Sequence, residues 1–333
     1  MGKLLVPGER TAPGIFSGRY CPGCPCAGIC HANGTAEACG DAAEYAAYDN
    51  ALHPVRAWNT SPTEFEFPST TWPPLPTLLD GVVVGDYLLP GTTVGIRLRE
   101  SMKPSTWAKR STCQTDAGMA VLLGKDMELE RAWERSGRLP RQLQVLAVPL
   151  VISPGFSTWW RDPPMSALHA MARSAYFAVL FSRRLPTVPT LVWRFRGDLE
   201  RWACWLTSSH AEAFCMDLAV RDRREQGWAL RGVADLASML GEGVATDMRL
   251  VAYGPSTRDR MLAVMDNWPG ELTFVSSNPW RQAQAGNCLL PDLTYRLDAR
   301  RSIRDVLHHN IEAFDRGVAG LLASRQHDRA TTA

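Results

Sequence analysis

The sequence has no long apolar segment, and this absence argues against a membrane protein. No apolar run approaches the roughly 18 residues that a spanning helix needs. No apolar stretch follows Lys3 in the way that a secretory signal requires. We therefore expect a cytoplasmic protein without a membrane partner.

Strong net charge is missing as well. The 36 Lys and Arg residues nearly balance the 34 Asp and Glu residues, which leaves a net charge of +2. A balance this close to neutral favours neither nucleic acid nor an acidic partner on charge alone. The sequence also lacks a Walker or Gly-x-Gly-x-x-Gly pattern, so a phosphate site would have to be built in another way.

Five of the nine cysteines lie close together near the N-terminus. Without a secretory signal, such a group is not a disulfide framework. The CxxC spacing of Cys21 and Cys24 lets two thiolates share one ion, and the Gly and Pro residues around them favour a knuckle-like loop. A structural zinc ion is the first choice; an iron–sulfur cluster or simply unliganded thiols are the alternatives. The predicted ligands are Cys21, Cys24, Cys30 and Cys39, with Cys26 or His31 as substitutes.

Length and composition suggest one large domain with an appendage. A chain of 333 residues exceeds the size at which single hydrophobic cores usually stop growing. Residues 60–76 are rich in Thr, Ser and Pro, which is typical of an extended linker. These features divide the chain into a Cys-rich segment with its linker (1–75), a main domain (76–325) and a frayed tail (326–333).

The clearest structural pattern lies between residues 248 and 280. Arg249–Tyr253 is a strand-like run that stops at Gly254 and a proline, and a helix with an apolar stripe follows. Trp268, followed by Pro and Gly, ends that helix, and Leu272–Val275 forms a second strand. A strand, helix and strand in this order predict two parallel strands with a covering helix.

The same alternation extends through most of the main domain. Several strand-like runs are apolar throughout, as parallel strands buried on both faces are. We predict an α/β fold with a TIM-barrel-like parallel β/α domain. About seven candidate strands are one short of a closed eight-stranded barrel, so an incomplete barrel or an open sheet competes with it. The other expected strands are 82–84, 93–98, 144–152, 188–193 and 213–220, and the other expected helices are 115–136, 165–183, 199–206, 233–240 and 302–324.

Four motifs carry a resemblance to a known family. They are VISPGFSTWW, LPTVPTLVWR, VAYGPST and FVSSNPWRQAQAGNCLL, in this order between residues 146 and 290. In these motifs the chain resembles the bacterial and phage family catalogued as domain of unknown function 4417. The resemblance implies an α/β barrel-like domain of a kind found in phages, plasmids and actinobacteria, and it implies no particular chemistry.

A second likeness, in outline only, is to the base-exchange transglycosylases that replace a guanine in tRNA or phage DNA. Those enzymes are barrels with a zinc-binding cysteine cluster and two aspartates near strand ends. The stretch GPSTRDRMLAVMDNWPGELTFVSSNPW is similar to their late βα unit. However, the cysteine cluster here is N-terminal, and no Asp-x-x-x-Pro-Thr-Arg setting is present.

Polar residues at the ends of parallel strands would converge on one pocket. Asp217 and Asp222 are the candidates for acid, base or nucleophile. A carboxylate in the apolar run 213–220 is costly unless partnered, which singles out Asp217; a buried pair with Arg194 or Arg249 is the structural alternative. Arginines and a helix N-terminus can hold phosphate. The substrate-binding candidates are Ser153, Phe156, Arg194, Arg196, Tyr253, Gly254, Ser256, Thr257, Ser276 and Asn278, all residue types that turns and caps also use.

Three functional hypotheses follow. The first is an enzyme of phage or mobile-element type that acts on a nucleobase or nucleotide, in the manner of a transglycosylase. The second is a non-catalytic, zinc-containing module on the same scaffold that binds nucleic acid or a protein. The third is an iron–sulfur redox enzyme, for which the same cysteines would hold the cluster.

Overall fold

The computed structural model describes residues 94–98, 102, 117–124, 126–145, 150–158, 164–208, 211–219, 223–298 and 301–332. Several predictions fall outside these residues. They are the strand at 82–84, the linker, the catalytic candidate Asp222, and the metal ligands Cys21, Cys24, Cys30 and Cys39 with their substitutes Cys26 and His31. The boundary at residue 75 therefore stays a prediction.

Eight of the ten described strands form two four-stranded sheets in which every strand pair is parallel. Within each sheet, strands that follow one another in the chain are also neighbours in space. The first sheet contains β1 (Val94–Arg97), β2 (Ala117–Val121), β3 (Val151–Ile152) and β4 (Thr187–Val188). The second contains β5 (Thr190–Leu191), β6 (Ala213–Asp217), β7 (Arg249–Tyr253) and β8 (Glu271–Val275).

A single short segment connects the two sheets. β4 and β5 are separated only by Pro189, which has no backbone N–H to donate. The carbonyl of Val188 accepts from Ser153 N on the β3 side, at 2.9 Å, and the carbonyl of Pro189 accepts from Cys215 N on the β6 side, at 2.8 Å. The segment from Thr187 to Leu191 therefore pairs with β3 along one edge and with β6 along the other.

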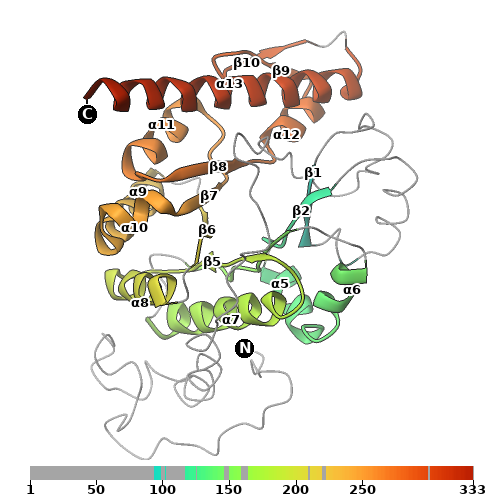
Figure 1. The fold of residues 1–333 in the computed structure, drawn as a ribbon. Coiled ribbons are helices and arrows are strands. Elements are labelled where there is room, and N and C mark those ends of the chain that lie inside the picture. Colours follow the sequence, from blue (N-terminus) through green and yellow to red (C-terminus); the bar gives the residue numbers. More distant parts are fainter. Residues whose placement is uncertain are drawn as a thin grey trace, which may run out of the picture.

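The helices lie around the outside of the strands (Figure 1). Most of them connect one parallel strand to the next, as parallel pairing requires. After β8, a short helix and an antiparallel hairpin precede the long C-terminal helix. The helices are α5 (Asp126–Glu134), α6 (Leu139–Val145), α7 (Pro164–Ser182), α8 (Arg196–Ser208), α9 (Arg223–Leu240), α10 (Glu242–Asp247), α11 (Arg258–Asn267), α12 (Asn278–Gln284) and α13 (Ile303–Thr332), and the hairpin is β9 (Asn287–Leu289) with β10 (Tyr295–Leu297).

The two faces of the strands have different partners. One face packs on the helices: Phe214 and Leu250 share a cluster with α8, α9, α11 and α13, while Ala120 and Val151 share another with α5, α6 and α7. The other face forms a third cluster to which strands and their flanking residues contribute and helices do not. Its members are Val121, Leu123, Leu150, Ile152, Val188, Ala213, Cys215, Val251, Tyr253 and Val275. Side chains from β2, β3, β4, β6, β7 and β8 thus meet on the side away from the helices.

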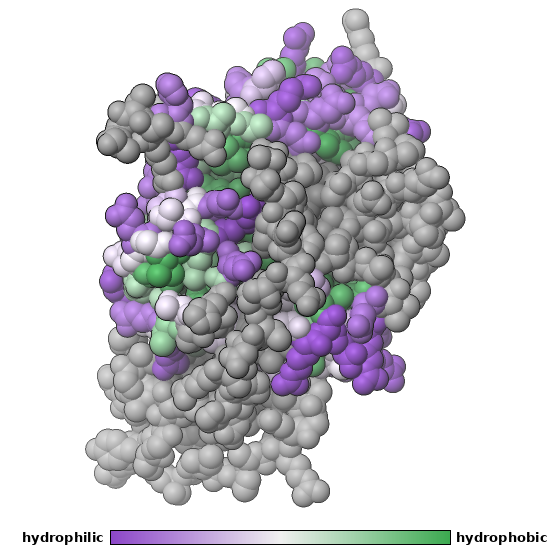
Figure 2. Space-filling view, viewed as in Figure 1, coloured by the Kyte–Doolittle hydropathy of each residue, from purple (hydrophilic) through white to green (hydrophobic). Residues whose placement is uncertain are grey.

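The surface agrees with this layering. In the space-filling view, hydrophilic residues dominate the described surface over α13, at the top of the molecule (Figure 2). The opposite face of α13 buries Val306, Leu307 and Phe314. None of the helices in the described ranges combines the length and apolarity needed to cross a bilayer.

The α/β class with parallel strands is confirmed, and several elements match closely. Arg249–Tyr253 is β7, the run from Leu272 to Val275 is β8 with one added residue, and the expected helix 165–183 is α7. The helix α13 continues to Thr332, through most of the segment that was expected to fray.

The long helix expected at 115–136 is wrong. Residues 117–121 form β2, and the helix α5 begins only at Asp126. The apolar run from Met119 to Leu123 is continuous, and such a run is equally compatible with a buried strand, so periodicity alone cannot distinguish the two. The expected strand 144–152 is also too long, because α6 extends to Val145 and β3 contains only Val151 and Ile152.

Candidate functional site

Because the strands are parallel, their C-terminal ends lie along one edge of the sheets. Asp217 and Tyr253 are the last residues of β6 and β7 and are direct partners in the strand register. Tyr253 is in turn the partner of Val275, the last residue of β8. Asp217 is exposed, whereas Tyr253 is buried against the inner cluster. The structure thus places these two predicted site residues side by side at the strand ends.

The surroundings of Asp217 differ from the sequence-based expectation. Asp217 ends the strand instead of interrupting it, and its side chain is not sealed in the core. Arg249, one of the two expected partners, instead donates to Glu271 and to Thr273 Oγ1. Arg249 and Glu271 are the first residues of β7 and β8, so that ion pair lies at the opposite ends of the strands.

Two groups fix the position of Asp217. Its Oδ1 accepts a hydrogen bond from Ala219 N at 2.9 Å, which closes a tight turn after β6. The guanidinium of Arg260, in the first turn of α11, donates to the carbonyl of Leu218. Desolvation lowers the pKa of Arg260, and the negative charge of Asp217 raises it. A half-buried arginine therefore lies next to the exposed carboxylate.

Cys215 lies on the same face of β6, two residues before Asp217, and is fully buried. Burial, and then the charge of Asp217, raises the pKa of the Cys215 thiol well above its ordinary value. Hydrogen bonds with the Thr190 side chain and the Tyr253 backbone lower it by less. Since the thiolate is the nucleophilic form, this cysteine is held in its unreactive state.

Gly254 allows the turns after β6 and β7 to approach one another. Its φ is +105°, and a Cβ at this position would lie 2.4 Å from the Cα of Ala219. Only glycine meets both conditions. Beyond it, Ser256 is partly exposed and Thr257 is exposed, and Thr257 occupies the N-cap of α11 without a side-chain capping bond.

Ser153 holds the fold together and does not line an opening. It is fully buried, its hydroxyl accepts from Thr190 N at 2.9 Å, and its carbonyl accepts from Thr190 Oγ1 at 2.6 Å. A Cβ on Gly155 would lie 2.4 Å from Cγ2 of Thr190. Residues of the VISPGFS and VPT motifs are thus in direct contact, and the role of Ser153 as a substrate-binding residue is not supported.

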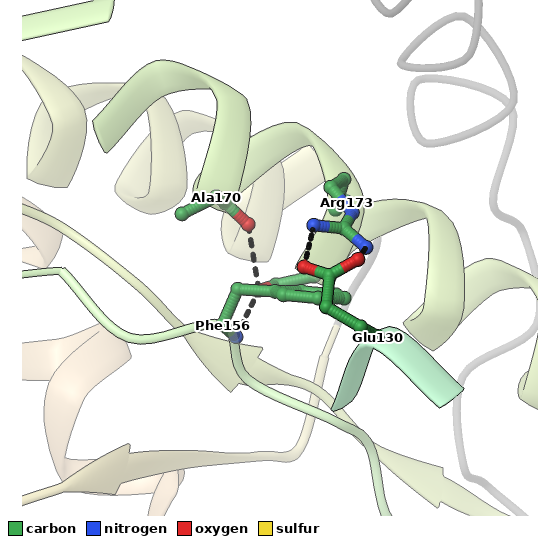
Figure 3. A network of polar contacts seen from close by, with 5 residues as sticks. Glu130, Phe156, Ala170 and Arg173 are labelled. Atoms are coloured by element: carbon green, nitrogen blue, oxygen red, sulfur yellow. Dashed lines mark hydrogen bonds and ion pairs between the residues drawn. The ribbon is translucent and has the colours of Figure 1, made fainter. Parts of the chain in front are cut away.

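Phe156 is likewise buried, in a polar and aromatic network (Figure 3). Its N–H donates to Ser174 Oγ at 3.0 Å, and its ring lies 3.7 Å from the guanidinium carbon of Arg173. Arg173 is itself buried and makes a bidentate pair with Glu130, at 2.7 and 2.8 Å. Stacking on Phe177 completes the surroundings. This ring connects the β3 turn to α7 and α5, and its burial gives no support to the prediction that Phe156 contacts substrate.

The two arginines predicted after β5, Arg194 and Arg196, make contacts near α8. The guanidinium of Arg194 lies over the ring of Phe195, 4.5 Å from its centroid. The backbone N–H groups of Arg194 and Phe195 donate to the Asp198 carboxylate. Arg196 is exposed and pairs with Asp235 of α9 at 3.1 Å and with Glu200 at 3.7 Å. Arg196 therefore connects α8 to α9 on the helical side, and its predicted role is not supported.

Ser276 and Asn278, which follow β8, form hydrogen bonds within the fold. Ser276 is buried, and its hydroxyl accepts from Asn278 N at 3.1 Å. The Asn278 amide donates to the hydroxyl of Tyr295 in β10. Burial raises the pKa of Tyr295 to about 12, so this phenol stays protonated. These residues anchor the β9–β10 hairpin to the end of β8.

Sequence reasoning missed Arg260. The available signal was its place in the first turn of the helix after the Gly254 turn, because that turn lies beside the ends of the neighbouring strands. No group of three or more His, Cys, Asp or Glu residues that could hold a metal occurs in the described ranges.

The fold and the site define an α/β protein with parallel strands, whose C-terminal strand ends carry an exposed carboxylate beside a half-buried arginine. No protein-family model matches the chain, and a search of curated proteins finds no similar sequence.

Proposed function

We propose that the chain is an enzyme of phage or mobile-element type that acts on a nucleobase or nucleotide, with Asp217 as its reacting carboxylate. The observation that carries the proposal is the Asp217–Arg260 arrangement at the ends of β6 and β7. Parallel β/α folds keep their catalytic groups at this edge. The carboxylate of Asp217 is not needed for packing, since the side chain is exposed.

The proposal includes a TIM-barrel-like scaffold, closed or one strand short. Two observations support it. Strands are neighbours in chain order, as they are in a barrel and not in a doubly wound sheet, where the order reverses. The inner faces of β2, β3, β4, β6, β7 and β8 contribute to a separate cluster, as the strands of a barrel would.

The substrate class rests on chemistry and on resemblance. The guanidinium of Arg260 suits a phosphate or a carboxylate. The outline likeness to base-exchange transglycosylases favours a nucleobase or nucleotide, and the resemblance to the uncharacterised bacterial and phage family favours only the phage or mobile-element setting. On this proposal the N-terminal cysteines hold a structural zinc ion, which adds no catalytic step.

The test is mass spectrometry of nucleosides from cells that express the full chain. We expect an altered nucleoside with the wild-type chain and a return to background with Asp217→Asn. The matched control is Asp247→Asn, because Asp247 is an exposed carboxylate that ends α10, before the N-terminal end of β7. If cells with the wild-type chain give the same nucleosides as cells without it, the proposed base modification is not supported, and equal modification by wild type and Asp217→Asn overturns the role of Asp217.

One observation favours the non-catalytic alternative, in which the chain is a zinc-containing module that binds nucleic acid or protein. The Oδ1 atom of Asp217 already accepts from Ala219 N, as a carboxylate that only closes a turn would. That alternative predicts unchanged nucleosides together with retention of nucleic acid or a protein partner by the purified chain.

A further inference from the structure

The contacts of Asp217 favour one of its two protonation states. Ala219 N donates to Oδ1 of Asp217 at 2.9 Å. An ionised carboxylate only accepts hydrogen bonds, and a backbone N–H that donates to it stabilises the charged form. This contact comes from the turn itself and does not depend on a ligand.

A second contact acts in the same direction. Arg260 projects from the first turn of α11 and donates to the carbonyl of Leu218, the residue that follows Asp217. This bond holds the guanidinium beside the strand end and out of bulk water, because the side chain is half-buried. An arginine stays charged in proteins, and an opposite charge nearby favours the ionised carboxylate.

Among the described residues, Cys215 on β6 and Tyr253 on β7 are two further titratable groups beside Asp217. Burial keeps the Cys215 thiol neutral, so it contributes no competing negative charge. Asp217 and Arg260 are then one anion and one cation at the same strand end. A general acid must instead be protonated before it acts, and these contacts oppose that state.

We propose that Asp217 acts as an ionised carboxylate, a general base or nucleophile and not a general acid, and that Arg260 is the positioning residue that holds it in that state. This inference rests on the proposed function for its chemical meaning. Its physical content, the ionisation of Asp217 and its dependence on Arg260, can be measured without knowing the substrate.

The test is a carbon-13 NMR titration of the aspartate carboxyl groups in the full chain, with the Asp217 resonance assigned by its loss in Asp217→Asn. Three variants separate charge from structure. Arg260→Lys keeps the charge, Arg260→Gln keeps an amide donor for Leu218 without the charge, and Arg258→Gln removes an exposed arginine from the same turn.

In the wild-type chain we expect Asp217 to titrate below the ordinary aspartate value of about 3.9. Arg260→Gln raises that midpoint by about one unit or more, while Arg260→Lys and Arg258→Gln leave it nearly unchanged. A purely structural role for Arg260 predicts lower stability and no change in the midpoint. A wild-type midpoint at or above about 3.9 overturns the proposal even if no Arg260 variant folds.

The result of this titration can be distinguished from the result of the nucleoside test of the proposed function. If nucleosides are unchanged in cells but Asp217 titrates low and responds to Arg260→Gln, the enzyme proposal fails and the electrostatic interaction between Arg260 and Asp217 stands as structural. If nucleosides change and Arg260→Gln does not move the midpoint, the enzyme stands and Arg260 is not the residue that keeps Asp217 ionised.

Discussion

Ser153 and Thr190 exchange two hydrogen bonds where the two parallel sheets meet. Pro189, one residue before Thr190, cannot donate to a neighbouring strand. The hydroxyl of Ser153 instead accepts from Thr190 N, and the hydroxyl of Thr190 returns a bond to the Ser153 carbonyl. Side chains thus replace part of the backbone pairing at the joint between β3 and β5.

Thr190→Val tests this joint. The substitution leaves the buried carbonyl of Ser153 without the Thr190 hydroxyl, and we expect a loss of about 1–3 kcal/mol in the free energy of unfolding. Thr207→Val is the control, because its exposed hydroxyl bonds only to Ala203 O within α8. Urea denaturation of both variants measures the difference, and equal midpoints would contradict a stabilising role for Thr190.

Gly317→Ala tests the docking of the β9–β10 hairpin on α13. A Cβ there would lie 2.5 Å from Cδ2 of Leu293, a buried residue with a φ of +65°. We expect overpacking to cost about 1–3 kcal/mol despite the better helix propensity of alanine. Gly320→Ala, with open space around its Cβ, should stabilise the chain by up to about 1 kcal/mol. Similar thermal shifts for the two variants would mean that the Leu293 side chain moves away from the added Cβ without a measurable loss of stability.

Asp315 predicts a pH dependence of stability. Burial, followed by the charge of Glu312, raises the pKa of Asp315 to about 7, while Arg316 lowers it. A carboxyl with a raised folded-state pKa contributes stability at low pH that is lost as the pH rises from about 4 towards 7. We expect the Tm of Asp315→Asn to fall less between pH 4 and pH 8 than that of the wild type. Asp266→Asn, at an exposed site, should keep the wild-type slope.

The cysteine cluster predicts a bound metal. We expect the purified chain to carry about one zinc ion, and Cys24→Ser to lose it. Cys204→Ser is the control because Cys204 is exposed in α8, far along the sequence from the cluster. A brown protein with broad visible absorption and iron in place of zinc would favour the iron–sulfur alternative.

Some strands can be predicted from the sequence and others cannot. β7 and β8 are recognisable because they are apolar, short and bounded by Gly or Pro. β2 was missed because its continuous apolar run also fits a helix, and only the parallel pairing with β1 and β3 decides it.

The site shows the same limit. Position at a strand end predicts that Asp217 and Tyr253 are neighbours, since parallel register brings them together. Position at a strand end does not predict that Ser153 and Phe156 are buried. Serine occurs in turns, and aromatic residues occur in hydrophobic cores, as readily as either occurs in a ligand-binding site. The position of Arg260 could not be predicted, because it depends on a hydrogen bond from α11 to Leu218, the residue after β6, and the two residues lie far apart in sequence.

The most direct test of the proposed activity is performed with the purified full chain and isolated nucleic acid, DNA and tRNA in separate reactions, with nucleosides quantified by mass spectrometry. We predict a new or depleted nucleoside with wild type and with Asp247→Asn, and at least about a hundredfold less with Asp217→Asn, as loss of a reacting carboxylate implies. Modification by Asp217→Asn at the wild-type level would contradict the proposal.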